Sequence, residues 1–149
     1  MTDSGNKTKR ILVIDDSAVV LNWVRMNLTP LGFEVTTSNT PFEVQGLINQ
    51  TQPDLILLDV RMDNLSGDLL CKMLKKDESH KNRVIVLYSS LPEDELAPLA
   101  KTCAADGFIH KTDDVEALVA CIDQFLALAD EPATDSAAGR TITLAVVDD

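Results

Sequence analysis

The sequence lacks the features that mark a membrane-spanning or secreted protein. None of its apolar runs approaches the roughly 18 residues that a membrane-spanning helix needs. The N-terminal segment MTDSGNKTKR is polar and contains no apolar stretch, so it does not resemble a signal peptide. We therefore expect a cytoplasmic protein that makes no contact with a membrane.

Cysteine and basic residues are also scarce. The cysteines Cys71, Cys103 and Cys121 include no Cys-x-x-Cys pair and fall in helical patterns, which favours buried free thiols over a catalytic thiol. Lys and Arg number 13 against 24 Asp and Glu, which gives a formal net charge of -11. This charge argues against a nucleic-acid-binding surface on the chain, and its simplest meaning is solubility.

What remains is the composition of an ordinary globular domain. Of the 149 residues, 45% are hydrophobic and 25% are charged, which suits one domain with its own core. Strands are predicted at 11–14, 33–37, 55–58, 83–90 and 107–110. Segments with helical spacing follow them at 21–31, 44–51, 70–74, 96–103 and 115–126. Because the strands are mostly aliphatic throughout, they predict a parallel, doubly wound sheet with helices on both faces.

Polar side chains stand where these strands end. The first strand is followed by Asp15 and Asp16 and the third by Asp59, while Ser89 ends the fourth and Lys111 follows the fifth. In a doubly wound sheet these strand ends share one edge, where ligands bind. Three carboxylates at one edge repel each other unless a cation joins them, and Mg2+ suits oxygen ligands. A carboxylate beside such an ion can act as a nucleophile toward a phosphoryl group.

The chain resembles the receiver domain of bacterial two-component response regulators over about residues 9–129. Four segments carry the resemblance, RILVIDDS at 10–17, PDLILLDVRMDNLSG at 53–67, VIVLYSS at 84–90 and GFIHK at 107–111. It implies a flavodoxin-like, five-stranded parallel sheet of order 2-1-3-4-5. It also implies a signalling module that accepts a phosphoryl group and then switches its protein contacts.

The resemblance assigns roles to single residues. It implies that Asp59 is the phospho-acceptor, that Ser89 and Lys111 contact the phosphoryl group, and that Ser89 and Phe108 take part in the switch. It implies Mg2+ as the cofactor, held by Asp15, Asp16, Asp59 and the backbone carbonyl of Arg61. The expected partners are a sensor histidine kinase or phosphotransfer protein and an unidentified protein effector. Direct contact with nucleic acid is not expected, because no helix-turn-helix fits after residue 129.

Three positions depart from the family pattern. Asp63 stands where the acceptor loop usually has proline, and Leu91 is apolar at a position that often influences loss of the phosphoryl group. Thr112 replaces the proline that usually follows the lysine. A cis bond without proline costs about 2.5–4 kcal/mol, so the Lys111–Thr112 peptide is predicted to be trans. None of the three departures removes a group of the site.

Two other functions compete with this prediction. A degenerate receiver would serve only as a docking scaffold without phosphorylation, but the complete acid, serine and lysine set favours an active one. A phosphatase of the haloacid-dehalogenase type also uses a nucleophilic aspartate but needs Asp-x-Asp after its strand. Here Asp15 and Asp16 are adjacent, and Arg61 stands where the second acid would follow Asp59. We therefore expect self-catalysed phosphorylation and dephosphorylation but no true enzyme.

The chain divides into three parts by pattern. A flexible flank is expected at 1–8, the receiver domain at 9–129, and a linker with a strand-like tail at 130–149. The tail sequence RTITLAVVDD echoes KRILVIDD near the N-terminus, so it either begins a second receiver-like domain or is an apolar stretch without that meaning.

A lone strand cannot bury itself, so this tail needs a partner. Residues 140–147 are predicted to be extended, to lie outside the five-stranded core, and to pair with a sheet edge. Asp148 and Asp149 are predicted to bind no metal. Pro98, inside the fourth helical segment, is expected to kink or shorten that helix.

Overall fold

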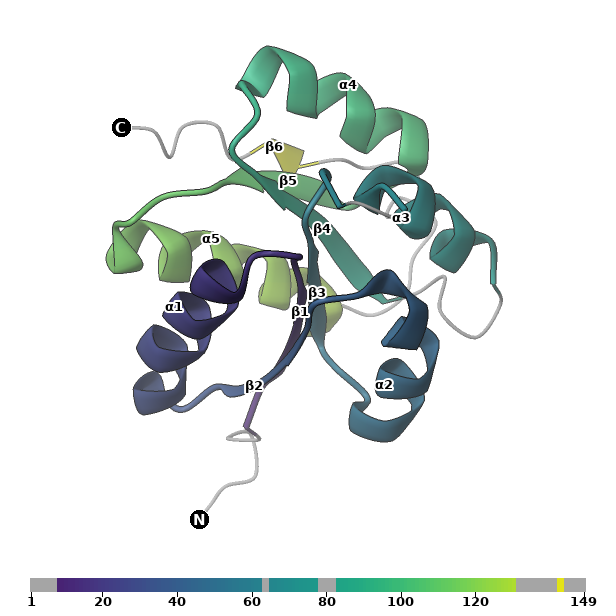
Figure 1. The fold of residues 1–149 in the computed structure, drawn as a ribbon. Helices are drawn as coiled ribbons and strands as arrows, with labels where there is room; N and C mark the ends of the chain where they lie inside the picture. Colours follow the sequence, from purple (N-terminus) through teal and green to yellow (C-terminus); the bar gives the residue numbers. More distant parts are fainter. Residues whose placement is uncertain (1–7, 63–64, 78–82, 131–141, 144–149) are drawn as a thin grey trace.

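A parallel β-sheet runs through the middle of the molecule, and helices cover both of its faces (Figure 1). The computed structural model describes residues 8–62, 65–77, 83–130 and 142–143. Its strands are β1 (Arg10–Ile14), β2 (Glu34–Ser38), β3 (Leu55–Leu58), β4 (Val84–Ser89), β5 (Gly107–His110) and β6 (Ile142–Thr143). Neighbouring strands are parallel, in the order β2-β1-β3-β4-β5-β6. The order predicted for the first five strands is therefore confirmed.

The helices alternate with the strands along the chain. They are α1 (Ala18–Leu28), α2 (Val44–Thr51), α3 (Gly67–Lys76), α4 (Glu93–Cys103) and α5 (Val115–Asp130), with 3-10 turns η1 (Thr29–Leu31) and η2 (Pro41–Glu43). Helices α1 and α5 pack on one face of the sheet, and α2, α3 and α4 pack on the other (Figure 1). Within the described residues, no helix combines the length and the apolar character that crossing a membrane requires.

The central strands β1, β3 and β4 are almost entirely apolar because each one serves two cores. On β1, Leu12 and Ile14 point into the core under α2, α3 and α4. The intervening Ile11 and Val13 point into the core under α1 and α5. Successive side chains of a strand face opposite sides, so a strand covered on both sides needs apolar residues at every position.

Pro98 does not interrupt α4, which runs without a break from Glu93 to Cys103. The helix is therefore not shortened at Pro98, while the predicted kink stays a prediction. Proline in a helix interior costs about 3 kcal/mol. Here the buried face of α4, formed by Leu96, Ala100 and Cys103, packs on the sheet on both sides of the proline. This packing holds the helix together, because tertiary contacts rather than propensity supply most of the stability of a helix.

The sixth strand comes from the tail. Residues Ile142 and Thr143 pair in parallel with Gly107 and Phe108 of β5, so β6 extends the sheet at the β5 edge (Figure 1). At these two residues the prediction of an extended tail outside the five-stranded core, paired with a sheet edge, is confirmed. The predictions for Asp63, Asp148 and Asp149 and for the N-terminal flank fall on residues outside the described part of the chain.

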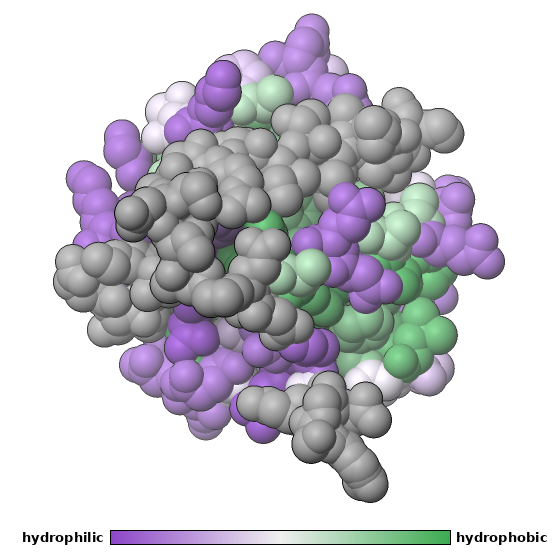
Figure 2. Space-filling view, turned by 180° about the vertical axis from the view of Figure 1, so that it is seen from behind, coloured by the Kyte–Doolittle hydropathy of each residue, from purple (hydrophilic) through white to green (hydrophobic). Residues whose placement is uncertain are grey.

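The back of the molecule is a mixture of polar and apolar side chains (Figure 2). The apolar ones gather toward the side where α1 lies. Three large apolar residues of α1 and η1 are exposed, namely Val19, Met26 and Leu31. The outer face of α1 and η1 therefore exposes more apolar surface than is usual for a helix face in contact with water.

Candidate functional site

Three carboxylates meet where β1 and β3 end. Asp15 and Asp16 follow β1, Asp59 follows β3, and the two strands are neighbours in the sheet. The Asp59 N–H donates a hydrogen bond of 2.8 Å to the Ile14 carbonyl, so the strand pairing reaches the acidic residue itself. One carboxylate oxygen from each of the three aspartates lies within 4.8 Å of the other two. The acidic cluster predicted at this edge is confirmed.

Lys111 joins the two buried carboxylates of the cluster. Asp15 is 0% and Asp59 is 5% exposed, whereas Asp16 is exposed to solvent. The Lys111 Nζ atom lies 2.6 Å from Asp15 Oδ2 and 3.3 Å from Asp59 Oδ1. The Ser17 N–H donates to Asp15 Oδ1 at 2.9 Å. One ammonium group therefore balances part of the charge of three carboxylates.

The negative charge that Lys111 does not balance affects the pKa of Asp59. Burial and the neighbouring Asp15 raise the pKa of Asp59 from 3.8 to about 6, and the Lys111 ammonium only partly offsets them. The buried Asp15 Oδ2 receives no well-directed hydrogen bond from the described residues, despite the nearby ammonium. Closely spaced carboxylate oxygens with unmet charge are the donor set of a hard divalent cation such as Mg2+, so these residues fit that ion.

The raised pKa makes stability depend on pH when divalent cations are absent. Below about pH 4 Asp59 is protonated in both the folded and the unfolded chain, so this residue does not lower the free energy of unfolding. As the pH rises to about 6, the unfolded chain ionises first, so the folded state loses stability. We expect Asp59→Asn in EDTA to become more stable than the wild type by up to about 3 kcal/mol at pH 8.

Urea denaturation of both proteins at several pH values checks this result. Their difference in unfolding free energy should grow between about pH 4 and pH 7 and then stay constant. Added Mg2+ should reduce it. A difference that does not change with pH would show that the Asp59 carboxylate has an ordinary pKa in the folded chain.

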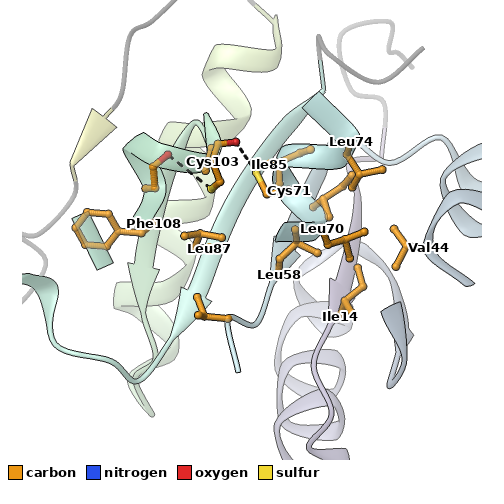
Figure 3. Close-up of a cluster of buried hydrophobic side chains, with 14 of the residues drawn as sticks. Ile14, Val44, Leu58, Leu70, Cys71, Leu74, Ile85, Leu87, Cys103 and Phe108 are labelled. Carbon is orange, nitrogen blue, oxygen red and sulfur yellow. Dashed lines mark hydrogen bonds between the residues drawn. The ribbon is translucent and has the colours of Figure 1, made fainter. Parts of the chain in front are cut away.

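Three more of the predicted residues lie near this edge or in the core beside it. Ser89 is the last residue of β4, and its buried Oγ accepts a hydrogen bond of 3.1 Å from the Leu91 N–H. Phe108 of β5 is buried in the core under α2, α3 and α4 (Figure 3). Arg61 follows Asp59 by two residues and is exposed.

The described residues contain no cis peptide bond, so the trans bond predicted after Lys111 is confirmed.

Known proteins share both this sequence pattern and this fold. Residues 11–123 match the family described as response regulator receiver domain. The chain belongs to this family. It is 30% identical over 121 residues to the DNA-binding dual master transcriptional regulator RpaA of Synechocystis sp., covering 81% of this chain and 50% of RpaA. The chain thus spans about half or less of the length of the curated relatives it matches.

Solved structures agree with the family. CheY4 of Vibrio cholerae, a chemotaxis response regulator, superposes with a TM-score of 0.74 at 23% identity, covering 80% of this chain and 99% of CheY4. This likeness shows the fold alone. The BeF3-activated DrrB receiver domain has a TM-score of 0.67 at 27% identity, covering 81% of this chain and 99% of that one. The receiver domains of this family are signalling modules of two-component systems.

Sequence reasoning missed Tyr88 as a neighbour of the site in this receiver domain. Lys111 Nζ lies 5.7 Å from the centre of the Tyr88 ring, within the range of a cation–π contact. The Lys111 N–H also donates to the Ser89 carbonyl at 2.8 Å, which fixes the start of the loop after β5. Burial and Asp15 raise the pKa of Tyr88, so the ring stays neutral. Alternation along β4 predicts only a buried position for Tyr88 and gives no sign of the lysine.

Gly67 is the second residue that the sequence did not single out. Its N–H donates to the Val60 carbonyl at 2.9 Å, which places the start of α3 against the loop after Asp59. A Cβ atom at this position would lie 1.9 Å from the backbone oxygen of Asp59. Only glycine allows α3 to approach the Asp59 backbone this closely. Gly67 therefore helps to fix the position of Asp59.

Proposed function

We propose that this receiver domain accepts a phosphoryl group on Asp59 in a Mg2+-dependent reaction and then changes its protein contacts. The observation that carries the proposal is the buried Asp59 carboxylate between Asp15 and the Lys111 ammonium, with a pKa of about 6. The relative DrrB is described in a BeF3-activated form, and BeF3 mimics a phosphoryl group on a carboxylate. That relative supports the same chemistry here.

Each residue of the site has a separate role in the proposed reaction. A carboxylate oxygen of Asp59 attacks phosphorus, and the bond from phosphorus to the leaving atom breaks with its electron pair on that atom. The leaving atom is an imidazole nitrogen when the donor is a phosphohistidine and an oxygen when it is acetyl phosphate. Asp15, Asp16, Asp59 and the Arg61 carbonyl would hold Mg2+, which neutralises charge that develops on the transferred oxygens. Lys111 is positioned to pair with one of these oxygens, because its ammonium already lies 3.3 Å from Asp59 Oδ1.

Switching would follow from the new charge. A phosphoryl group adds about -1.5 to -2 charges and three acceptor oxygens. Lys111 would then divide its contacts between Asp15 and the phosphoryl group, and the Ser89 hydroxyl would turn from the Leu91 N–H toward it. Ser89 precedes α4, and Phe108 packs in the core that α4 covers. Converting a 1:99 equilibrium to 99:1 takes about 5.5 kcal/mol, which several charge-assisted contacts can supply.

A sensor histidine kinase or phosphotransfer protein is the proposed phosphoryl donor. Helix α1 begins two residues after Asp16, so its exposed Val19 follows the acidic cluster closely, and Met26 adds a second exposed apolar side chain farther along the same helix. The downstream effector is proposed to be a protein. The chain itself carries a net charge of -11, which is unfavourable for binding nucleic acid. The relative RpaA is DNA-binding, which concerns that longer protein. We place the domain at residues 9–129, in the cytoplasm.

Removing the metal tests the proposal directly. Incubation with acetyl phosphate and Mg2+ should add one phosphoryl group to the chain, seen by intact-mass spectrometry. EDTA in place of Mg2+ should abolish the addition, because the acidic cluster then carries unbalanced charge that repels the donor. No addition in Mg2+ would instead support the alternative of a degenerate receiver that serves as a docking scaffold.

A further inference from the structure

Two cysteines from different helices meet in the core under α2, α3 and α4 (Figure 3). Cys71 lies in the middle of α3 and Cys103 is the last residue of α4. The Cys71 thiol donates to the Cys103 carbonyl, with 3.6 Å between sulfur and oxygen. The Cys103 thiol donates to the Ala100 carbonyl at 3.7 Å. The two side chains are thus held against each other although 32 positions separate them in the sequence.

The two thiols are not chemically equivalent. The close contact of the two side chains lowers the pKa of Cys103 and raises that of Cys71. Burial raises the pKa of Cys71 further. Because the thiolate is the reactive form of cysteine, Cys103 is the better nucleophile and Cys71 the proton-bearing neighbour. This is the arrangement of an attacking thiol with a resolving thiol beside it.

We propose that Cys71 and Cys103 are a redox modification site that closes to a reversible disulfide between α3 and α4 when the chain meets a peroxide. The Cys103 thiolate attacks one peroxide oxygen, the O–O bond breaks, and the other oxygen leaves as hydroxide or alkoxide. The sulfenic acid of Cys103 is then attacked by the Cys71 sulfur, which loses its proton as the hydroxyl leaves as water. Two thiols are oxidised by two electrons, and one peroxide is reduced.

Access of the oxidant requires α4 to open at its C-terminal end, because Cys71 is 0% and Cys103 is 2% exposed. Two features weaken this helix, one in its middle and one at its C-terminal end. Pro98 has no N–H to donate within the helix. Ala104, directly after Cys103, has a φ of 65°, a left-handed conformation that costs about 1 kcal/mol or more without glycine. Oxidation is therefore expected to be slow in buffer and faster at low urea concentrations, below the unfolding transition.

Cys121 supplies the matched control within the same chain. It lies on α5 in the other core, on the opposite face of the sheet, and its exposure is 1%. Cys71 and Cys103 share the first core, so the sheet separates Cys121 from both of them. The pair is also independent of Asp59 as a nucleophile, so failure of phosphorylation would not affect this proposal.

The test is oxidation of the full chain with hydrogen peroxide, followed by unfolding, alkylation and thiol counting. The three free thiols should fall to one, and non-reducing peptide mapping should show a single linkage between Cys71 and Cys103. Dithiothreitol should restore all three. Cys121→Ser should form the same linkage, while Cys71→Ser and Cys103→Ser should form none. Three thiols remaining after prolonged treatment, a linkage that includes Cys121, or linkage only between two chains would overturn the proposal. The wild-type result decides it even if a serine variant fails to fold.

Discussion

Asp59→Asn should take up no phosphoryl group from acetyl phosphate and Mg2+ under conditions in which the wild type takes up one. An amide is not a nucleophile toward phosphorus, so the reaction loses its acceptor completely. Asparagine has nearly the shape of aspartate, and the ion pair of 2.6 Å between Lys111 and Asp15 remains. Loss of uptake is therefore expected without loss of the fold.

Intact-mass spectrometry of both proteins measures this effect, and circular dichroism checks their folding. Asp68→Asn is the matched control, because Asp68 lies in the first turn of α3, one residue after Gly67, but belongs outside the acidic cluster. It should take up one phosphoryl group like the wild type. Equal uptake by Asp59→Asn and the wild type would remove Asp59 as the acceptor.

Gly67→Ala should strongly destabilise the fold. The new Cβ atom would lie 1.9 Å from the Asp59 oxygen and 2.8 Å from the Asp59 carbonyl carbon. Both obstacles are backbone atoms, so α3 and the loop after β3 must separate. Overpacking of this kind costs about 1–3 kcal/mol where side chains can yield, and we expect about 3 kcal/mol or more here. Phosphoryl uptake should also fall, because the Asp59 backbone moves.

Gly46→Ala provides the comparison for this prediction. Gly46 lies inside α2, and a Cβ atom there meets nothing within 4 Å. Alanine is the better helix former, so this variant should gain about 0.5–1 kcal/mol. Urea denaturation of the two variants and the wild type measures both effects. If the two alanine variants changed stability in the same direction, the close approach of Gly67 to Asp59 would be refuted.

Much of the site could be predicted because strand ends follow from local patterns, while the order of the strands was implied by the resemblance to receiver domains. The apolar runs that end at Asp15 and Asp59 are short-range signals, and parallel topology places their ends together. Helix ends were harder to predict, since α3 begins at Gly67 and the helical spacing became visible only from Leu70. Pro98 does not shorten α4, because the buried face of this helix is packed on the sheet on both sides of the proline.

The sequence by itself determined the acidic edge and the presence of a tail strand, and its resemblance to receiver domains implied the strand order. Only the tertiary structure decided that the tail pairs with β5, that Tyr88 lies under Lys111, that Gly67 contacts the Asp59 backbone, and that Cys71 meets Cys103. The acidic edge and the tail strand depend on hydrophobic periodicity and chain direction, which can be recognised in consecutive residues. The features that only the tertiary structure decided depend on distances between elements, which are set by packing of the whole core and leave no local pattern.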